Sequence, residues 1–177
     1  ADPANRLCRF LHLSMQHGSD RILQAMNRKY SAADFVSLVK NIRKLIPDIH
    51  IGTDFIVGFP GETDADFQQM LDIAEKVAFA NIHAFAYSIR PGTPAATMPG
   101  QIPAPTVKER MARLSMTAQK LADDFARSQT GRELPVIFEQ EHRGILTGWS
   151  DNYLAVSVPS GTYPAGRIIK LTGNEKN

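Results

Sequence analysis

The chain has 177 residues, of which 43% are apolar and 21% charged, and its formal net charge is +2. This composition is typical of a globular protein with one full domain or two partial ones. A single cysteine, Cys8, excludes an intramolecular disulfide and a metal site built from several cysteines of this chain. No apolar stretch approaches the ~18 residues of a membrane span. No secretory signal is visible either, so we expect a cytoplasmic protein.

Residues 9–90 alternate between strand-like and helix-like patterns. Two helices are expected to begin with capping boxes, because Ser31 precedes Asp34, and Thr63 precedes Asp66, by three positions. Strands that alternate with helices predict a parallel sheet, and three such units are too few to close an eight-stranded barrel. We therefore expect an incomplete (β/α) barrel. The predicted elements are strands over 9–16, 49–57 and 81–87 and helices over 21–26, 31–46 and after 63.

The pattern changes twice after residue 90. Five prolines fall within residues 90–105 and predict an irregular crossing segment. A long helix is expected from Thr106, with Glu109 at its capping-box position and Gly131 at its end. Short β-type runs follow and predict a small OB-like antiparallel barrel, so we divide the chain into domains 1–130 and 131–177. The runs cover 134–138, 144–147, 153–158 and 168–171.

Three motifs carry a family resemblance. They are LHLSMQHGSD at residues 11–20, with MNRKY just after it, TDFIVGFPGE at residues 53–62, and YSIRPGTPAA at residues 87–96. In this order they resemble the fourth, fifth and sixth strands of the radical S-adenosylmethionine (SAM) core in the methylthiotransferases that modify tRNA or a ribosomal protein. The tail from about residue 131 is similar to the TRAM domain of that family, an OB-like RNA-binding barrel. The resemblance covers nearly the whole chain.

The resemblance implies a transferase that adds a methylthio group to carbon 2 of a modified adenosine at position 37 of tRNA. In that family one [4Fe–4S] cluster reduces SAM and a second delivers sulfur. The family's three cluster cysteines, spaced Cys-x-x-x-Cys-x-x-Cys, are absent from this chain. We therefore expect two clusters whose ligands lie elsewhere in the protein, no metal ligands here, and no activity from this chain alone. The implied partners are tRNA and the missing N-terminal half of the same protein, with no membrane.

The amino-acid sequences of two predicted strands resemble those of the branch of the family that acts on threonylcarbamoyladenosine. These are the runs LHLS at residues 11–14 and IHAFAYS at residues 82–88. The isopentenyladenosine branch usually has proline where Ser14 stands. Two alternatives stay open: an enzyme for isopentenyladenosine or for a ribosomal-protein aspartate, and an RNA-binding module without a catalytic partner.

In barrels of parallel strands, chemistry gathers where the strands end. Ser14 and Gln16 are expected on one face at the carboxyl end of the first strand. They could form hydrogen bonds to the ribose or methionine part of SAM, or only to backbone groups at the end of the strand. Family members place the strand that supports adenine at the next motif, where Gly58 lets the backbone approach a ligand. In the family this glycine and the glutamate are usually one residue closer than Gly58 and Glu62 are here, so Glu62 is assigned no ligand contact. The expected cofactor contacts are Ser14, Gln16, Ile56, Val57, Gly58 and Pro60.

Asp54 faces the same side as Ile56, and a carboxylate inside a barrel must be paired. It is expected to orient cofactor or substrate, or to form an ion pair with an arginine or lysine. The strand histidines His12, His50 and His83 are interpreted as packed or rim residues rather than general bases.

RNA contacts are expected from cations and from aromatic rings that stack on bases. Arg28, Lys29 and Arg90 are candidates for phosphate contact, although such surface charges are usually only solvated. In the C-terminal part, Trp149 is either a stacking residue or part of the core. The candidates there are Arg143, Trp149, Tyr153 and Arg167.

Overall fold

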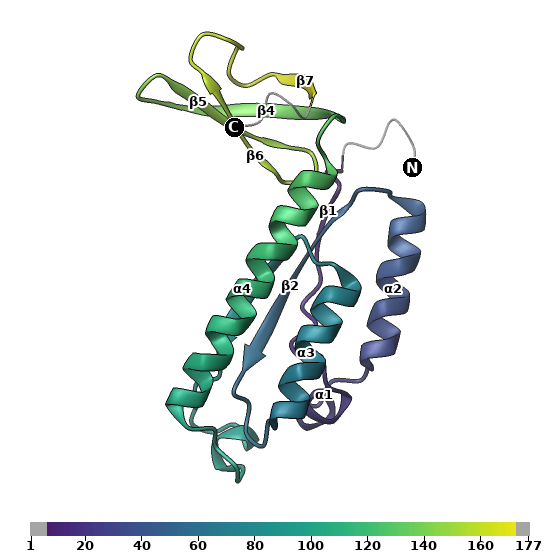
Figure 1. Cartoon of the computed structure of the whole chain (residues 1–177), viewed down its shortest axis with the longest axis vertical. Helices are drawn as coiled ribbons and strands as arrows, with labels where there is room; N and C mark the ends of the chain where they lie inside the picture. Colours follow the sequence, from purple (N-terminus) through teal and green to yellow (C-terminus); the bar gives the residue numbers. More distant parts are fainter. Residues whose placement is uncertain (1–6, 173–177) are drawn as a thin grey trace.

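The computed structural model describes residues 7–172, which form two sheets connected by a long helix (Figure 1). The first sheet is parallel, with strand order β1-β2-β3, and the second is antiparallel, with strand order β6-β5-β4-β7. The elements are β1 (Phe10–His12), α1 (Asp20–Ala25), α2 (Ala32–Leu45), β2 (His50–Val57), α3 (Asp64–Val77), β3 (Asn81–Ala86), the 3-10 turn η1 (Pro94–Thr97), α4 (Ala104–Ser128), β4 (Glu133–His142), β5 (Ile145–Ser150), β6 (Ala155–Pro159) and β7 (Ile168–Thr172).

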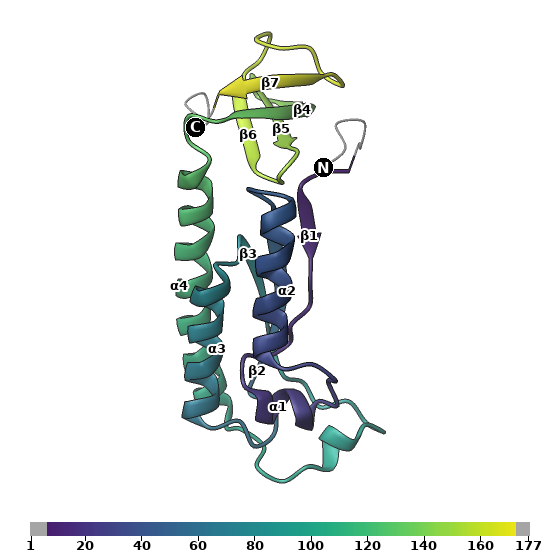
Figure 2. The same cartoon turned by 90° about the vertical axis from the view of Figure 1, so that its right-hand side faces the viewer.

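Helices α2, α3 and α4 cover one face of the parallel sheet (Figure 2). Alternate residues of β2 point into this core because successive side chains of a strand face opposite sides. Ile51, Phe55 and Val57 are fully buried there, whereas Asp54 and Ile56 face the other side and are only half-buried. No helix of the described residues covers that second face, which is therefore an open surface.

The predicted capping boxes of α2 and α3 are both present. Ser31 and Asp34 bond reciprocally at the start of α2, and Thr63 and Asp66 do the same at the start of α3. The predicted long helix is confirmed as α4, but its capping box was wrong: the helix starts at Ala104, and Pro103 at its N-cap makes no side-chain hydrogen bond. The first backbone N–H groups of a helix lack intrahelical partners, so proline is tolerated in this turn and the helix needs no capping box.

The first strand is shorter than predicted. β1 pairs with β2 only from Phe10 to His12, and a separate parallel bridge joins Gln16 to Phe55. Gln16 has a φ of 71°, so its backbone turns away from the extended conformation that a continuous strand requires.

The second sheet is open and is not a closed barrel. β6 pairs with β5 and β7 pairs with β4, so these two strands form its edges in the described part of the chain. Its small core consists of the inward side chains of all four strands, including Leu134, Phe138 and Val156. The predicted domain boundary near residue 130 falls in the connection from α4 to β4 and stays a prediction.

The second sheet lies at the amino-terminal ends of β1 and β2 (Figure 1). Arg9 donates two hydrogen bonds to the Asp151 carboxylate, at 2.7 and 2.8 Å, and Arg132 pairs with Asp48. These contacts fix the antiparallel sheet at the end of the parallel sheet opposite to the carboxyl ends of its strands. None of the helices within residues 7–172 has the length and apolar character to cross a bilayer.

His50 is buried where the two sheets meet, in contact with the rings of Phe10, Phe125 and Tyr153. Its Nδ1 donates to the Asn152 carbonyl at 3.2 Å, while Nε2 is buried without a hydrogen-bond partner among the described residues. Burial lowers the pKa of His50 to about 4, although the bond to Asn152 opposes this shift. The packed interpretation of His50 agrees with this position.

This burial predicts a loss of stability in acid. In the unfolded chain a histidine has a pKa of ~6.5, whereas His50 in the folded protein has a pKa of about 4. As the pH falls from ~6.5 towards about 4, the unfolded chain binds a proton that the folded protein does not, so the free energy of unfolding decreases. We expect a loss of up to ~3 kcal/mol over this window. Urea unfolding at several pH values, beside His50→Gln, measures it. The variant should lose this part of the pH dependence; parallel curves for both proteins would contradict the prediction.

Candidate functional site

A cavity of about 420 Å³ opens at the carboxyl ends of β2 and β3. One part of its wall is apolar, with Ile56, Phe59 and Phe85, and another part is polar. The Tyr87 hydroxyl at this wall is buried and has no hydrogen-bond partner within residues 7–172. The other lining residues are Gln16, Asp54, Ala86, Ser88, Arg90, Thr93 and Ala95.

The three motifs singled out in the sequence meet at this cavity. The first contributes Gln16, the second contributes Asp54, Ile56 and Phe59, and the third contributes the segment from Tyr87 to Ala95. The structure therefore brings together Gln16, Asp54, Ile56 and Arg90 among the predicted site residues. Phe59 and Tyr87 were not assigned a role from the sequence, although both lie within the motifs.

Four predicted cofactor contacts do not line the cavity. Ser14 is one of them, and its hydroxyl donates to the lining residue Asp54. Val57 is fully buried in the core under the helices, because it alternates with Ile56 along β2. Pro60 is buried, and Gly58 has a φ of 81° and packs against Val107 of α4, which an added Cβ would approach to 2.6 Å. The glycine at this position is required by the turn and by the close approach of α4.

Asp54 lies between two histidines on the open face. Its Oδ2 accepts a hydrogen bond from Ser14 Oγ at 2.6 Å and lies 3.1 Å from His12 Nε2, and its Oδ1 lies 3.4 Å from His83 Nδ1. Burial opposes ionisation, but the hydrogen bonds from Ser14 and His12 outweigh it and lower the pKa of Asp54. The predicted pairing with an arginine or lysine was wrong: the partners of this carboxylate are two imidazoles and a hydroxyl.

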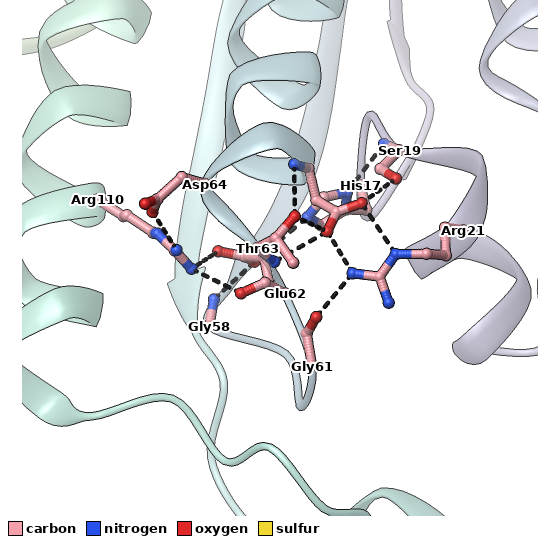
Figure 3. Close-up of polar contacts among 10 residues, drawn as sticks. His17, Ser19, Arg21, Gly58, Gly61, Glu62, Thr63, Asp64 and Arg110 are labelled. Carbon is pink, nitrogen blue, oxygen red and sulfur yellow. Dashed lines mark hydrogen bonds and ion pairs between the residues drawn. The ribbon is translucent and has the colours of Figure 1, made fainter.

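A buried ion network supports the turn that follows β2 (Figure 3). The Glu62 carboxylate accepts from the Gly58 amide at 2.9 Å and from Arg110 of α4 at 2.7 Å, and its Oε2 lies 3.2 Å from His17 Nε2. The Glu62 side chain is 0% exposed and that of Arg110 is 6% exposed. Glu62 therefore holds the turn that carries Phe59 through contacts within the protein.

A second carboxylate, that of Asp66, joins α1 to α3, and Figure 3 labels its partners Ser19, Arg21 and Thr63. Asp66 accepts hydrogen bonds from Arg21, Thr63 and Ser19. Burial alone would raise the pKa of Asp66, but these bonds outweigh it and hold the pKa well below its usual range. Arg21 also donates to the Gly61 carbonyl at 2.7 Å, so this network fixes the turn from its other side.

The candidate RNA-binding residues lie on exposed parts of the chain. Arg28 and Lys29 are in the turn between α1 and α2, and Arg90 is at the rim of the cavity. Trp149 and Tyr153 stack with ring centroids 4.7 Å apart and are 41% and 49% exposed, so Trp149 is not part of the core. These two rings line an apolar groove beside Pro135 and Ile168. Arg143 is exposed in the β4–β5 turn, and Arg167 is exposed just before β7.

Comparisons with known proteins agree with the motifs. A family model described as the Radical SAM superfamily matches residues 3–74. The threonylcarbamoyladenosine tRNA methylthiotransferase MtaB of Thermotoga maritima is 45% identical over 150 residues, which are 84% of this chain and 35% of the relative. The tRNA-2-methylthio-N(6)-dimethylallyladenosine synthase of Jannaschia sp. is 43% identical over 92% of this chain and 36% of the relative.

A third relative, the tRNA-2-methylthio-N(6)-dimethylallyladenosine synthase of Cereibacter sphaeroides, is 44% identical over 94% of this chain and 38% of its own length. The chain thus spans little more than a third of the curated relatives that it matches. Both branches match at nearly the same identity, so the comparisons identify the family and not the branch. The motifs, the cavity at which they meet and these relatives show that the chain belongs to the radical-SAM methylthiotransferase family.

Proposed function

We propose that the protein to which this chain contributes is a tRNA methylthiotransferase that adds a methylthio group to carbon 2 of adenosine 37, with threonylcarbamoyladenosine as its substrate. The observation that carries the proposal is the convergence of all three family motifs on one cavity. Relatives named as tRNA methylthiotransferases support the reaction. The support for the substrate is the resemblance of residues 11–14 and 82–88 to the threonylcarbamoyladenosine branch.

Ser14 also favours the threonylcarbamoyladenosine branch. Its hydroxyl donates to Asp54 at 2.6 Å, so the site wall depends on a group that proline lacks. A proline here, as in the isopentenyladenosine branch, would leave the Asp54 carboxylate without this donor. The choice between serine and proline therefore changes the hydrogen bonding of a carboxylate in the cavity wall.

The cavity has the chemistry to bind SAM. Gln16 and Ser88 offer hydrogen bonds to its polar parts, and Ile56, Phe59 and Phe85 offer apolar surface to adenine. When bound, SAM supplies the radical chemistry of the reaction. The residues of this chain orient it and close one wall against water.

A [4Fe–4S] cluster does not fit this chain. Such clusters need several thiolates, and Cys8 is the only cysteine and is exposed before β1, at the opposite end of the strand from the cavity. We propose that two clusters are held by residues outside this chain, one by the N-terminal half of the barrel and the other by a further N-terminal domain, and that the chain alone does not cleave SAM.

The test of the substrate is an assay of the full-length reconstituted protein. Equal amounts of tRNA bearing threonylcarbamoyladenosine or isopentenyladenosine are offered, and the 2-methylthio nucleosides are measured by mass spectrometry. We expect the first to react at least ~10-fold faster. The opposite order would overturn the branch assignment, and no methylthiolation of either tRNA would overturn the proposed reaction.

We further propose that residues 131–177 act as a TRAM-like, OB-related domain that binds tRNA. Exposed stacked rings beside an apolar groove, with arginines on neighbouring turns, suit bases and phosphates.

Loss of one phosphate contact should reduce the slope of log affinity against log salt by about one unit. We expect this for Arg143→Ala and Arg167→Ala, and a loss of ~1–3 kcal/mol in binding for Tyr153→Ala through lost stacking. The measurement is tRNA binding titrated against salt. The matched control is Arg127→Ala, because Arg127 pairs with Asp124 on α4. An unchanged slope in both arginine variants would move RNA contact to Arg28, Lys29 and Arg90.

A further inference from the structure

Three side chains on the open face of the parallel sheet form a compact set of metal-ligand groups. His12, Asp54 and His83 each offer one ligand atom, and these atoms all lie within 4.8 Å of one another. Within residues 7–172 this is the one group of three or more such side chains that meets this condition. It is independent of Cys8 and of the buried network around Glu62.

The sheet register brings the three residues together. Asp54 of β2 and His83 of β3 are direct partners in the parallel ladder, and His12 of β1 is the partner of Gly52, which lies on the same side of β2 as Asp54. An added Cβ on Gly52 would approach His12 Nδ1 to 3.2 Å, so the absent side chain leaves space for the imidazole. The ring of His12 can therefore lie across β2 with its Nε2 towards Asp54.

Two separations are close to the edge length of a tetrahedral metal site. With metal–ligand bonds of ~2.0–2.1 Å, two ligand atoms of a tetrahedron lie ~3.3 Å apart. Asp54 Oδ2 lies 3.1 Å from His12 Nε2, and the other carboxylate oxygen, Oδ1, lies 3.4 Å from His83 Nδ1. One ligand atom from each of the three residues lies within 4.8 Å of the others, so the side chains would have to close around a metal ion.

Neighbouring side chains hold these groups in place, as the outer partners of metal ligands do. Ser14 donates to Asp54 at 2.6 Å, and the Asn81 side-chain amide lies 2.8 Å from His83 Nε2. The Asn81 amide nitrogen donates to Nε2, so in the metal-free protein Nδ1 carries the proton and faces Asp54. Metal binding through Nδ1 would place this proton on Nε2 and turn the Asn81 amide oxygen towards it.

We propose that His12, Asp54 and His83 form a binding site for one divalent transition-metal ion of the Zn²⁺ class. Two imidazoles and one carboxylate are a donor set that such ions prefer, and a fourth position faces the open side of the sheet. The side chains are 30%, 23% and 53% exposed, so an ion can enter from solvent. This site revises the expectation that the chain holds no metal ligands, and it does not depend on the proposed enzymatic function.

The experiment is calorimetric titration of the 177-residue chain, without a histidine tag, with Zn²⁺, together with visible absorption after adding Co²⁺. We expect one Zn²⁺ per chain and the intense Co²⁺ bands of a tetrahedral site. Asp54→Asn, His12→Ala and His83→Ala should each weaken Zn²⁺ binding ~10-fold or more. The matched control is His142→Ala, because His142 is exposed on β4 of the other sheet; it and Cys8→Ser should bind as the unchanged chain does.

Far-UV circular dichroism confirms that each variant is folded before titration. Zn²⁺ should also raise the melting temperature of the unchanged chain and of His142→Ala but not of Asp54→Asn, because only a ligand that binds the folded state stabilises it. The absence of saturable binding at millimolar Zn²⁺ would overturn the proposal. Binding that survives both His83→Ala and Asp54→Asn, or that His142→Ala weakens equally, would overturn it as well, and would show that the two histidines only hydrogen-bond to Asp54.

Discussion

Replacing Glu62 with glutamine is expected to lower the free energy of unfolding by about 3–5 kcal/mol, because it removes one partner of a buried ion pair. Arg110 would keep its charge while its side chain is only 6% exposed. Glutamine preserves the volume of the side chain, so the loss would come from charge and hydrogen bonding rather than from a cavity. For a chain of this size we expect a fall in melting temperature of roughly 6–20 °C.

The neighbouring carboxylate provides the matched control. Asp64 accepts from the same guanidinium at 2.6 Å, but its side chain is 94% exposed. Asp64→Asn should cost less than about 1 kcal/mol, as exposed ion pairs do. Urea unfolding of both variants tests the pair. Equal losses for the two variants, or a loss below 1 kcal/mol for Glu62→Gln, would show that burial does not set the strength of this network.

Glu62→Gln should also affect the cavity, because Glu62 supports the turn that carries a residue of the cavity wall. Glu62 accepts from the Gly58 amide, and the turn between these two residues carries Phe59 into the cavity wall. A network that loses its central carboxylate leaves this turn less firmly held. The stability of the turn and the shape of the proposed SAM site are therefore coupled through one buried side chain.

Local patterns in the sequence predicted local structure well. The alternation of residues 49–57 indicated β2, and the spacing from Ser31 to Asp34 and from Thr63 to Asp66 indicated both capping boxes. The parallel order of the three strands followed from alternating strands and helices. These features depend on residues close in sequence, so periodicity and spacing suffice to find them.

Contacts between residues that are distant in the sequence could not be predicted from it. Nothing local to Glu62 indicates that Arg110 reaches it from α4, or that Asp54 lies between His12 and His83. Register decides which side chains of neighbouring strands meet, and the sequence of one strand does not contain the register of the next. The prediction of a C-terminal barrel was wrong for the same reason. A barrel would require the edge strands β6 and β7 to pair with each other, and such pairing depends on contacts between residues distant in sequence.

Gly58 shows how the two kinds of information combine. Its place at a strand end suggested close approach of a ligand, whereas the structure assigns the close approach to Val107 of α4. The sequence predicted a close approach to the backbone at Gly58, but it did not indicate the contact with Val107. Its substitution therefore tests packing of α4 on the turn.

Gly58→Ala is expected to destabilise the protein through two effects of similar size. A φ of 81° costs an alanine about 1–3 kcal/mol. The new methyl group would lie 2.6 Å from Val107 Cγ2, and such overpacking costs a further ~1–3 kcal/mol. Gly92→Ala separates these effects, because Gly92 has a φ of 82° with nothing within 4 Å of an added Cβ. It should show the cost of backbone strain alone.

A double-mutant cycle isolates the contact with α4. Val107→Ala removes the two methyl groups that the new side chain meets, so in the double variant the overpacking should disappear and the backbone strain should remain. We expect a favourable coupling of ~1–3 kcal/mol between Gly58→Ala and Val107→Ala in urea unfolding. A coupling near zero would mean that α4 moves freely away from the turn. In that case Gly58→Ala would cost no more than Gly92→Ala, and the glycine would be required by its backbone conformation alone.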